Sequence, residues 1–475
     1  MKRNTWITVS GCIALVACGG GGSSVAGIDG RGAPARVAVA AQGPITGFGS
    51  VIVNGVRYDT SNATFDVDGV AGAESDLAVG QVVTIRGTTD ENGNDARADE
   101  VIYADLVEGP VESVDVAQER FVVLGQTVIT NGDTVFEDDF NPRSIAGVSP
   151  GDIVEVSGFA TGTGEILATY VEIEDSPGDF EVVGIVANLD AANLSFEING
   201  LTVDYSGASL SDFPNGAPEN GQRVEAEGSL GGSGELVATS VEFEGDDDLG
   251  ASTGDDVEIE GLITRFVSDT DFDVNGIPVT TTGSTSFSNG TAADLALNVA
   301  VEVDGEVDAN GVVVADSIDF EQEGTLELRG AIEATTAGSV TLLGVTATVT
   351  ASTALDDQSS GAVSPFGLGD LNVGDYVEVR GFDDGGTLTL TGLTREDDPG
   401  ESGLEGPVTA VANPDFTALG VSVTTTVDTE FQDADENDID AATFFATALN
   451  ETVQVDGDYS GGVLTADEVE IQDDD

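Results

Sequence analysis

The sequence has no histidine, one lysine (Lys2) and two cysteines (Cys12 and Cys18), and each scarcity argues against a class of chemistry. Histidine is the usual general base near neutral pH and the commonest transition-metal ligand. Its absence, with so few cysteines, argues against zinc sites and against Ser/His or Cys/His nucleophiles. Oxygen-liganded cations remain open, so Ca²⁺ is the one cofactor that we keep as a candidate.

Positive charge is also scarce. Lysine and arginine together number 14 against 88 aspartates and glutamates, which gives a net charge of −74. A surface this negative repels phosphate backbones, so we expect no nucleic acid partner. The negative surface is compatible with cationic partners and metal ions.

The start of the chain has the pattern of an export signal. Lys2 and Arg3 precede an apolar segment from Trp6 to Val16 that is interrupted by polar residues. This segment is shorter than the about 20 residues that a transmembrane helix needs. We therefore predict a signal peptide over residues 1–17.

The tetrapeptide Leu15–Cys18, "LVAC", resembles the lipobox of bacterial lipoproteins, in which the cysteine is lipidated and becomes the first mature residue. The alternatives are a disulfide with Cys12 and an ordinary signal that contains cysteines. Cys12 lies in the segment to be removed, which leaves one cysteine and no internal bridge. We predict a lipid anchor at Cys18, followed by a flexible tether of small residues over 18–42. Gly19 after the cysteine resembles outer-membrane sorting.

The rest of the chain repeats one module six times. Each copy opens with a glycine before apolar alternation, at Gly43, Gly109, Gly184, Gly261, Gly330 and Gly406. A short strand and a turn such as "VNG" or "LLG" follow, and Asn-Gly between apolar residues is a strong hairpin signal. A third strand, an irregular or briefly helical segment and two further strands complete the module.

One position before the fourth strand is glycine or asparagine in every copy. It is occupied by Gly80, Gly151, Gly221, Asn298, Gly374 and Asn450. These two residue types most readily enter the left-handed region, so we predict a positive φ at all six positions.

Three strands, a variable element and two strands are the order of the OB-fold. We predict an all-β chain of six tandem, small, OB-like five-stranded barrels after the signal peptide and tether, with a five-stranded sandwich as the alternative. The predicted repeats cover residues 43–106, 109–174, 183–244, 257–321, 326–396 and 404–472.

The lipobox and the pattern G-x-[IV]…[VI]-N-G…G-x-x-V-x-V-x-G…A-x-x-[IV] resemble the bacterial family called domain of unknown function 5666. The resemblance covers nearly the whole mature chain, and copies four to six drift from it. It implies OB-like modules in envelope lipoproteins and supplies no catalytic residues.

The sharpest acidic cluster is "DADENDID", with Asp433, Asp435, Asp438 and Asp440. Oxygen ligands at alternate loop positions are typical of Ca²⁺ sites, but an EF-hand needs glycine at the sixth position, where Asp438 stands. The two interpretations are a metal site and a solvated acidic loop.

Two functions follow from these observations. The first is a non-enzymatic envelope lipoprotein with a structural or adhesive role, bound to the membrane through its lipid and to other envelope proteins. The second is a multivalent array that binds saccharides or cations, including Ca²⁺. Paired carboxylates can hydrolyse glycosides, but six similar modules without one unrepeated polar constellation argue against an enzyme. The face of the membrane and the oligomeric state are left open.

Overall fold

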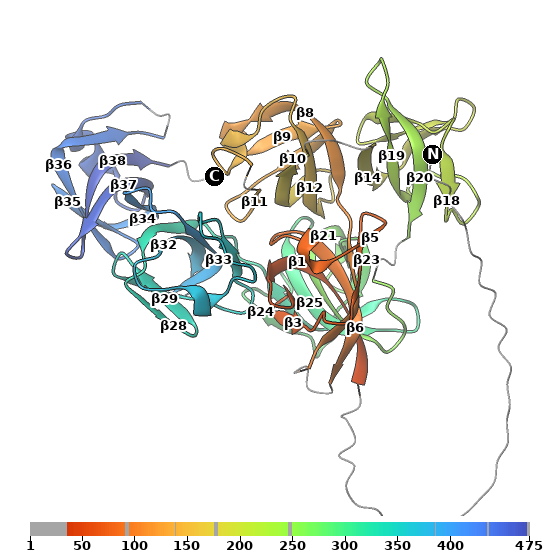
Figure 1. Cartoon of the computed structure of the whole chain (residues 1–475), viewed down its shortest axis with the longest axis horizontal. Helices are drawn as coiled ribbons and strands as arrows, with labels where there is room; N and C mark the ends of the chain where they lie inside the picture. The colour runs from red at the N-terminus through yellow and green to blue at the C-terminus, as the bar shows by residue number, and fades with distance from the viewer. Residues whose placement is uncertain are drawn as a thin grey trace, which may run out of the picture. The chain divides into compact units, whose positions relative to one another are not determined.

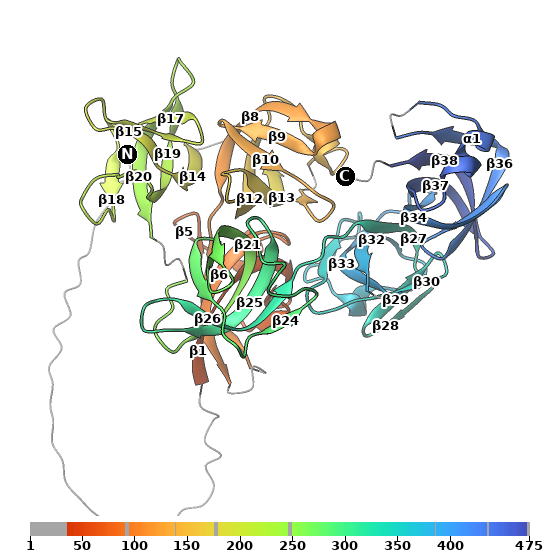
Figure 2. The same ribbon diagram turned by 180° about the vertical axis from the view of Figure 1, so that it is seen from behind.

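The structure is a computed structural model that describes residues 36–90, 95–137, 139–174, 179–245, 249–384, 386–434 and 437–472. Nearly all regular structure in these ranges is β-strand, and their one α-helix is α1 (Ala441–Thr447) (Figures 1 and 2). In the same ranges we find no helix with the length and apolar character to cross a membrane. The predicted signal peptide and Cys18 lie outside the described residues.

Each of the six copies contributes five principal strands. In copy 1 they are β1 (Arg36–Gly47), β2 (Val51–Val53), β3 (Val56–Tyr58), β6 (Val82–Asp90) and β7 (Arg97–Tyr103). In copy 2 they are β8 (Val107–Asp115), β9 (Arg120–Val123), β10 (Gln126–Ile129), β12 (Ile153–Ala160) and β13 (Ile166–Ile173). In copy 3 the first strand is split, giving β14 (Phe180–Ile185) and β15 (Ala187–Asp190), then β16 (Ser195–Ile198), β17 (Leu201–Asp204), β19 (Arg223–Leu230) and β20 (Leu236–Glu244).

The C-terminal three copies follow the same plan. Copy 4 has β21 (Asp256–Ser268), β22 (Asp271–Val274), β23 (Ile277–Thr280), β25 (Ala300–Val307) and β26 (Val313–Phe320). Copy 5, again with a split first strand, has β27 (Leu326–Ala331), β28 (Ala334–Thr336), β29 (Ser339–Leu342), β30 (Val345–Thr348), β32 (Tyr376–Asp383) and β33 (Leu388–Glu396). Copy 6 has β34 (Ser402–Ala412), β35 (Asp415–Ala418), β36 (Val421–Gln432), β37 (Thr452–Ser460) and β38 (Val463–Ile471).

Copy 2 shows how the barrel closes. Strand β8 pairs with β9, β9 with β10, β13 with β12, and β12 again with β8, all antiparallel. Strands β10 and β13 are parallel, which completes a ring of five strands. Copies 4 and 6 form the same closed ring, through the additional pairings β21–β22 and β34–β37. This order of strands confirms the predicted all-β, OB-like fold.

A short extra strand precedes the fourth principal strand in five copies. These strands are β4 (Thr64–Val67), which continues into a hairpin with β5 (Val70–Gly72), β11 (Val135–Phe136), β18 (Ser209–Ser211), β24 (Ser286–Ser288) and β31 (Ala354–Asp357). Each of the five runs parallel to the last strand of its own copy. In copy 6 the second half of β36 makes this pairing, and α1 then covers the core with Phe444.

The glycine that ends the fourth-strand motif of each copy sits in a β-bulge. The register shifts at Gly87, Gly158, Gly228, Gly305, Gly381 and Gly457. A Cβ at Gly158 would lie 2.1 Å from the carbonyl oxygen of Leu167 on the neighbouring strand. Glycine is therefore required here by the close approach of two backbones.

The six turn residues before the fourth strand all have positive φ. The angles are 95° at Gly80, 100° at Gly151, 90° at Gly221, 66° at Asn298, 98° at Gly374 and 72° at Asn450. Each backbone N–H donates to the carbonyl of the residue two positions after the opening glycine of its copy, as Gly151 does to Val111 at 2.8 Å and Asn298 to Ile263 at 2.8 Å. The turn thus holds the fourth strand against the first.

The first strands also join copies in pairs. Strand β8 of copy 2 runs antiparallel to β14 of copy 3, and β27 of copy 5 runs antiparallel to β34 of copy 6. One hydrophobic cluster spans copies 2 and 3, and another spans copies 5 and 6. Copies 1 and 4 are joined by a parallel pairing of β1 with β21, while most of their core residues form separate clusters.

The tether predicted over 18–42 is wrong at its C-terminal end, because β1 already begins at Arg36. The segment "RVAVAAQ" pairs with β6 on one side, and its second half pairs with β21 on the other. Partners on both sides supply hydrogen bonds and burial that small residues alone do not indicate, so residues 36–42 belong to copy 1.

Candidate functional site

The joint between copies 2 and 3 carries a row of glutamates across five adjacent strands. Direct register pairs link Glu172 on β13, Glu155 on β12, Glu108 on β8, Glu181 on β14 and Glu227 on β19. We call these five residues the glutamate row. Directly opposed residues project from the same face of a sheet, so five carboxylates lie side by side. Like charges in this arrangement repel one another.

The strand pattern explains why the glutamate row faces away from the barrel cores. Val107, Val154 and Val182, which are sequence neighbours of row members, are fully buried in the shared hydrophobic cluster. Because side chains alternate along a strand, the glutamates between them point to the opposite face. That face is itself partly covered, since Glu181 is 9% exposed.

Residues from the end of copy 1 complete the surroundings of the row. Tyr103, the last residue of β7, donates its hydroxyl hydrogen to Oε1 of Glu155. Asp105, in the link between copies 1 and 2, is 3% exposed, and its carboxyl contacts that of Glu181. Among the described residues, nothing donates a hydrogen bond to Oδ1 of Asp105. Asp68 accepts a hydrogen bond from the backbone N–H of Asp105 at 3.2 Å.

Burial and mutual repulsion raise the pKa of most of the row. Burial, followed by neighbouring carboxylates, raises the pKa of Glu108 to about 7 and that of Glu181 to about 9. Burial likewise raises the pKa of Glu155 to about 8, although Tyr103 opposes the shift. Asp105 has a pKa well above its usual range for the same reason, with Glu181 the largest charged neighbour. These upward pKa shifts mean that the site holds more carboxyl groups than it can solvate in their charged form.

Three groups of carboxylates bring one oxygen per residue within 4.8 Å of one another. The groups are Glu155, Glu172 and Glu174; Glu181, Glu225 and Glu227; and Glu258, Glu302 and Asp304. The first two lie at the two ends of the glutamate row, and the third lies on β21 and β25 of copy 4. Ca²⁺ binds oxygens at 2.3–2.6 Å, so two of its ligands can stand up to about 5 Å apart. Such spacing suits an oxygen-liganded cation.

The joint between copies 5 and 6 has the same backbone pairing and a different charge pattern. The register places Glu378 opposite Arg329, Arg329 opposite Gly403, and Gly403 opposite Asp456. Arg329 therefore occupies the position that Glu108 occupies in copy 2, one residue before the opening glycine. Its Nη2 lies 2.8 Å from Oδ1 of Asp456. Here arginine neutralises the carboxylates.

Arg380 adds a second cation to that joint. Its Nη2 lies 2.7 Å from Oε2 of Glu327, and its Nε lies 3.1 Å from Oε1 of Glu378. Glu327 also contacts Arg329 at 2.8 Å. The two joints thus share a scaffold, and only the joint between copies 5 and 6 has arginines at these positions.

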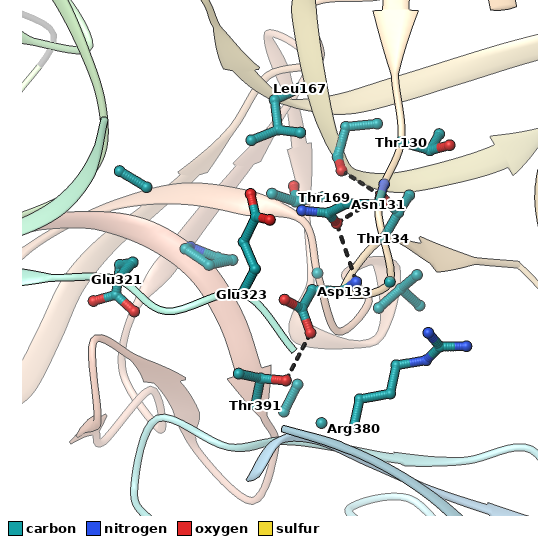
Figure 3. A pocket seen from close by; sticks show the side chains of 18 of the residues that line it. Thr130, Asn131, Asp133, Thr134, Leu167, Thr169, Glu321, Glu323, Arg380 and Thr391 are labelled. Carbon is teal, nitrogen blue, oxygen red and sulfur yellow. Dashed lines mark hydrogen bonds between the residues drawn. The ribbon is translucent and has the colours of Figure 1, made fainter. Parts of the chain in front are cut away.

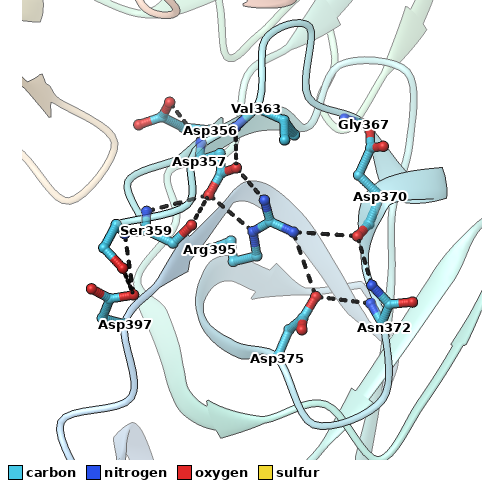
Figure 4. A network of polar contacts seen from close by, with 11 residues as sticks. Asp356, Asp357, Ser359, Val363, Gly367, Asp370, Asn372, Asp375, Arg395 and Asp397 are labelled. Atoms are coloured by element: carbon cyan, nitrogen blue, oxygen red, sulfur yellow. Dashed lines mark hydrogen bonds and ion pairs between the residues drawn. The ribbon is translucent and has the colours of Figure 1, made fainter.

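A separate ion-pair network fixes an irregular loop in copy 5 (Figure 4). Arg395 on β33 donates from Nε to Asp357 at 2.9 Å and also pairs with it through Nη2. It further contacts the backbone carbonyl of Asp370 at 3.3 Å. The side chain of Asp357 is 2% exposed, and hydrogen bonds from Arg395, Ser359 and Val363 lower its pKa to about 2. The network ties β33 to the chain segments around Asp357 and Asp370.

A cavity of about 1260 Å³ opens among loops of several copies (Figure 3). Asp133 lies at its centre and accepts hydrogen bonds from Thr391 Oγ1 at 2.7 Å and from the Gly324 backbone at 2.9 Å. Asn131 and Thr134 bond to each other beside it. These polar groups already bind one another. The centre of the cavity is therefore occupied by hydrogen bonds between Asp133 of copy 2 and the chain at and just before copy 5.

The described residues of the acidic cluster predicted in copy 6 each have a separate backbone partner. Asp440 caps α1 by accepting from the Thr443 backbone at 2.8 Å, and Asp433 accepts from the Asn437 backbone at 2.9 Å. Asp438 forms a β-bridge with Gln432. Asp435 lies outside the described residues. The described members serve as caps and turn acceptors, and the close carboxylate groups of the described chain lie elsewhere.

Sequence reasoning missed the glutamate row. Its members stand in strands such as "VEVSG", "VEIED" and "RVEAEG", where a glutamate between valines indicates an ordinary solvent face. Only the pairing of β8 with β14 aligns them. One signal was available: the residue before the opening glycine is Glu108 in copy 2 and Arg329 in copy 5.

The strand order and the repeats define this molecule as a tandem array of OB-like β-barrels. The chain belongs to the family described as domain of unknown function (DUF5666), whose model matches residues 42–101, 108–172, 183–242, 260–319, 329–389 and 405–470. No curated protein matches the sequence. A solved structure described as "drosophila Unr CSD456" is similar at 15% identity over 46% of this chain and 98% of that one, with a TM-score of 0.12.

Proposed function

We propose that this chain is a non-enzymatic cell-envelope lipoprotein, a structural or adhesive array of barrels attached to a membrane through lipidated Cys18. The observation that carries the structural part is the pairing of copies through their first strands, which extends hydrogen-bonded sheets from one barrel into the next. Backbone pairing of this kind makes a joint stiffer than a flexible linker does. A stiff array suits a load-bearing or spacing role.

The attachment rests on sequence. Lys2 and Arg3, the apolar segment and "LVAC" together favour export and lipidation, and Gly19 favours the outer membrane. Cys18→Ser is expected to move the protein from the membrane pellet to the soluble fraction of cells. A variant that stays in the pellet after a high-salt wash contradicts the anchor. Cys12→Ser is the matched control and is expected to leave the protein in the membrane.

The structural or adhesive role is tested by crosslinking on intact cells, followed by capture of the chain. We expect envelope proteins to be crosslinked to the native chain and not to the soluble Cys18→Ser form. Equal crosslinking of both forms contradicts a role that depends on position at the membrane.

A second candidate is a binding array for cationic ligands, and the glutamate row favours it. Direct pairing of five glutamates is unfavourable unless protons or cations neutralise them. Saccharide binding, the other ligand class that the sequence left open, is tested by calorimetry with cell-wall oligosaccharides. Heat that does not exceed dilution contradicts it.

A further inference from the structure

The glutamate row is a structural anomaly that the scaffold role does not explain. A stiff joint needs only paired backbones. Copies 5 and 6 show that arginine at the position of Glu108 gives the same pairing, with ion pairs between the arginine and neighbouring carboxylates. Copies 2 and 3 keep glutamate there instead. Glu108 lies directly opposite Glu155 on one side and Glu181 on the other.

A second observation indicates that the row receives a ligand. Asp105 is 3% exposed, contacts Glu181, and has an Oδ1 that receives no hydrogen bond within the part of the chain that is described. A buried carboxylate oxygen without a donor is unfavourable, so such atoms are normally satisfied by an ion or water. Asp105 belongs to the link from copy 1, and its carboxyl contacts Glu181, a member of the oxygen group that also contains Glu225 and Glu227.

We propose that the glutamate row binds Ca²⁺ at its two ends, and that the bound ions relieve the repulsion across the joint between copies 2 and 3, where arginine does so at the equivalent joint between copies 5 and 6. Glu155, Glu172 and Glu174 supply ligands for one ion, and Glu181, Glu225 and Glu227 supply ligands for the other, so that Glu108 lies opposite a ligand of each site. All-carboxylate ligand sets held on a protein scaffold suit Ca²⁺ better than Mg²⁺, which usually keeps several of its waters and binds through one or two carboxylates.

The inference concerns the pairing of copies and is independent of the lipid anchor, so fractionation of Cys18→Ser has no bearing on it. It also differs from the acidic loop of copy 6, whose described carboxylates cap α1 and a turn. Ca²⁺ binding at this joint makes the stiffness of the array depend on the divalent cation concentration around it.

Terbium is a suitable probe, because it takes Ca²⁺ ligands and emits when a nearby tyrosine is excited. Tyr103 touches Glu155 and is therefore a built-in sensitiser. We expect the full chain, freed of metal at pH 8, to give tyrosine-sensitised terbium emission that CaCl₂ displaces and NaCl of equal ionic strength does not. Tyr103→Phe is expected to reduce the emission.

Glu108→Arg copies the charge found at Arg329 and decides the assignment. We expect it to weaken Ca²⁺ binding about tenfold or more, measured by calorimetry, because it puts a cation directly opposite the ligands Glu155 and Glu181. Glu181→Gln, which keeps the shape of the side chain, is expected to act in the same direction if Glu108→Arg does not fold. Glu112→Arg is the control: it changes the charge equally, on the same strand, at an exposed position.

Each outcome of these experiments either supports or overturns the proposed site. Ca²⁺ binding that is lost in Glu108→Arg or Glu181→Gln and kept in Glu112→Arg supports the site. Absence of Ca²⁺ heat and of sensitised emission in the native chain overturns it. Equal Ca²⁺ affinity in all variants also overturns it. So does unchanged emission when both Tyr103 and Tyr170, whose hydroxyls contact Glu155 and Glu172, are replaced by phenylalanine, because the ion then binds elsewhere.

Discussion

Replacing Gly158 with alanine puts a methyl group where the bulge in copy 2 leaves no room. The new Cβ would lie 2.1 Å from the Leu167 carbonyl oxygen and 2.9 Å from the Ala168 Cα, whereas ordinary contacts are 3.4–4 Å. Both neighbours are backbone atoms, so β12 and β13 must separate by about 1 Å, and overpacking of this kind costs about 1–3 kcal/mol. We expect the upper part of that range, since the ladder itself has to open.

Hydrogen exchange followed by mass spectrometry localises the effect, because copies 2 and 3 share a core and need not unfold separately. We expect Gly158→Ala to speed exchange in β12 and β13, with a matching loss in denaturant midpoint. Gly232→Ala is the control, as its added Cβ meets nothing within 4 Å and its effect should stay within about 0.5 kcal/mol. Equal exchange in the two variants would refute the close-approach argument.

Three further predictions follow from the same structure. The stability of the metal-free chain should fall as pH rises from about 5 to 9. The raised pKa values of Glu108 and Glu181 mean that the folded state keeps protons that the unfolded state releases. Thermal unfolding across this pH range measures the fall. Arg395→Gln should cost about 3 kcal/mol in denaturant unfolding, since Asp357 stays buried without its cation, and a loss under 1 kcal/mol contradicts this. Gly151→Val should cost about 1 kcal/mol or more through its φ of 100° alone, because an added Cβ meets nothing there, whereas Gly151→Asn should cost less.

The repeat and the strand order were predictable because their signals are local. Asn-Gly turns predict the hairpin of strands two and three. The replacement of glycine by asparagine at Asn298 and Asn450 indicates a required backbone angle rather than a side-chain function. The closing glycine of each copy was visible in the sequence as well. Its reason, a bulge against the last strand, needed the partner strand.

The features that escaped prediction depend on partners distant in sequence. The short strands β11 and β24 are two or three residues long and pair only with the last strand of their copy, so they carry no periodicity of their own. The first part of β1 pairs with β6 from Arg36 onward and with β21, more than two hundred residues away, from Val39 onward. The glutamate row likewise exists only through the register between copies 2 and 3.

The parallel pairing of β1 with β21 has a mechanical consequence. A pull applied between the N-terminal end at Arg36 and the C-terminal copies enters through β1 and can cross directly to β21, because Val39 to Gln42 lie alongside Asp256 to Ile259. Parallel strands pulled at opposite ends are loaded in shear, so their hydrogen bonds share the tension instead of breaking one by one. Copies 2 and 3 lie in the chain between β1 and β21, so this direct path of the force does not pass through them. While that strand pair holds, the joint with the glutamate row carries little of the tension.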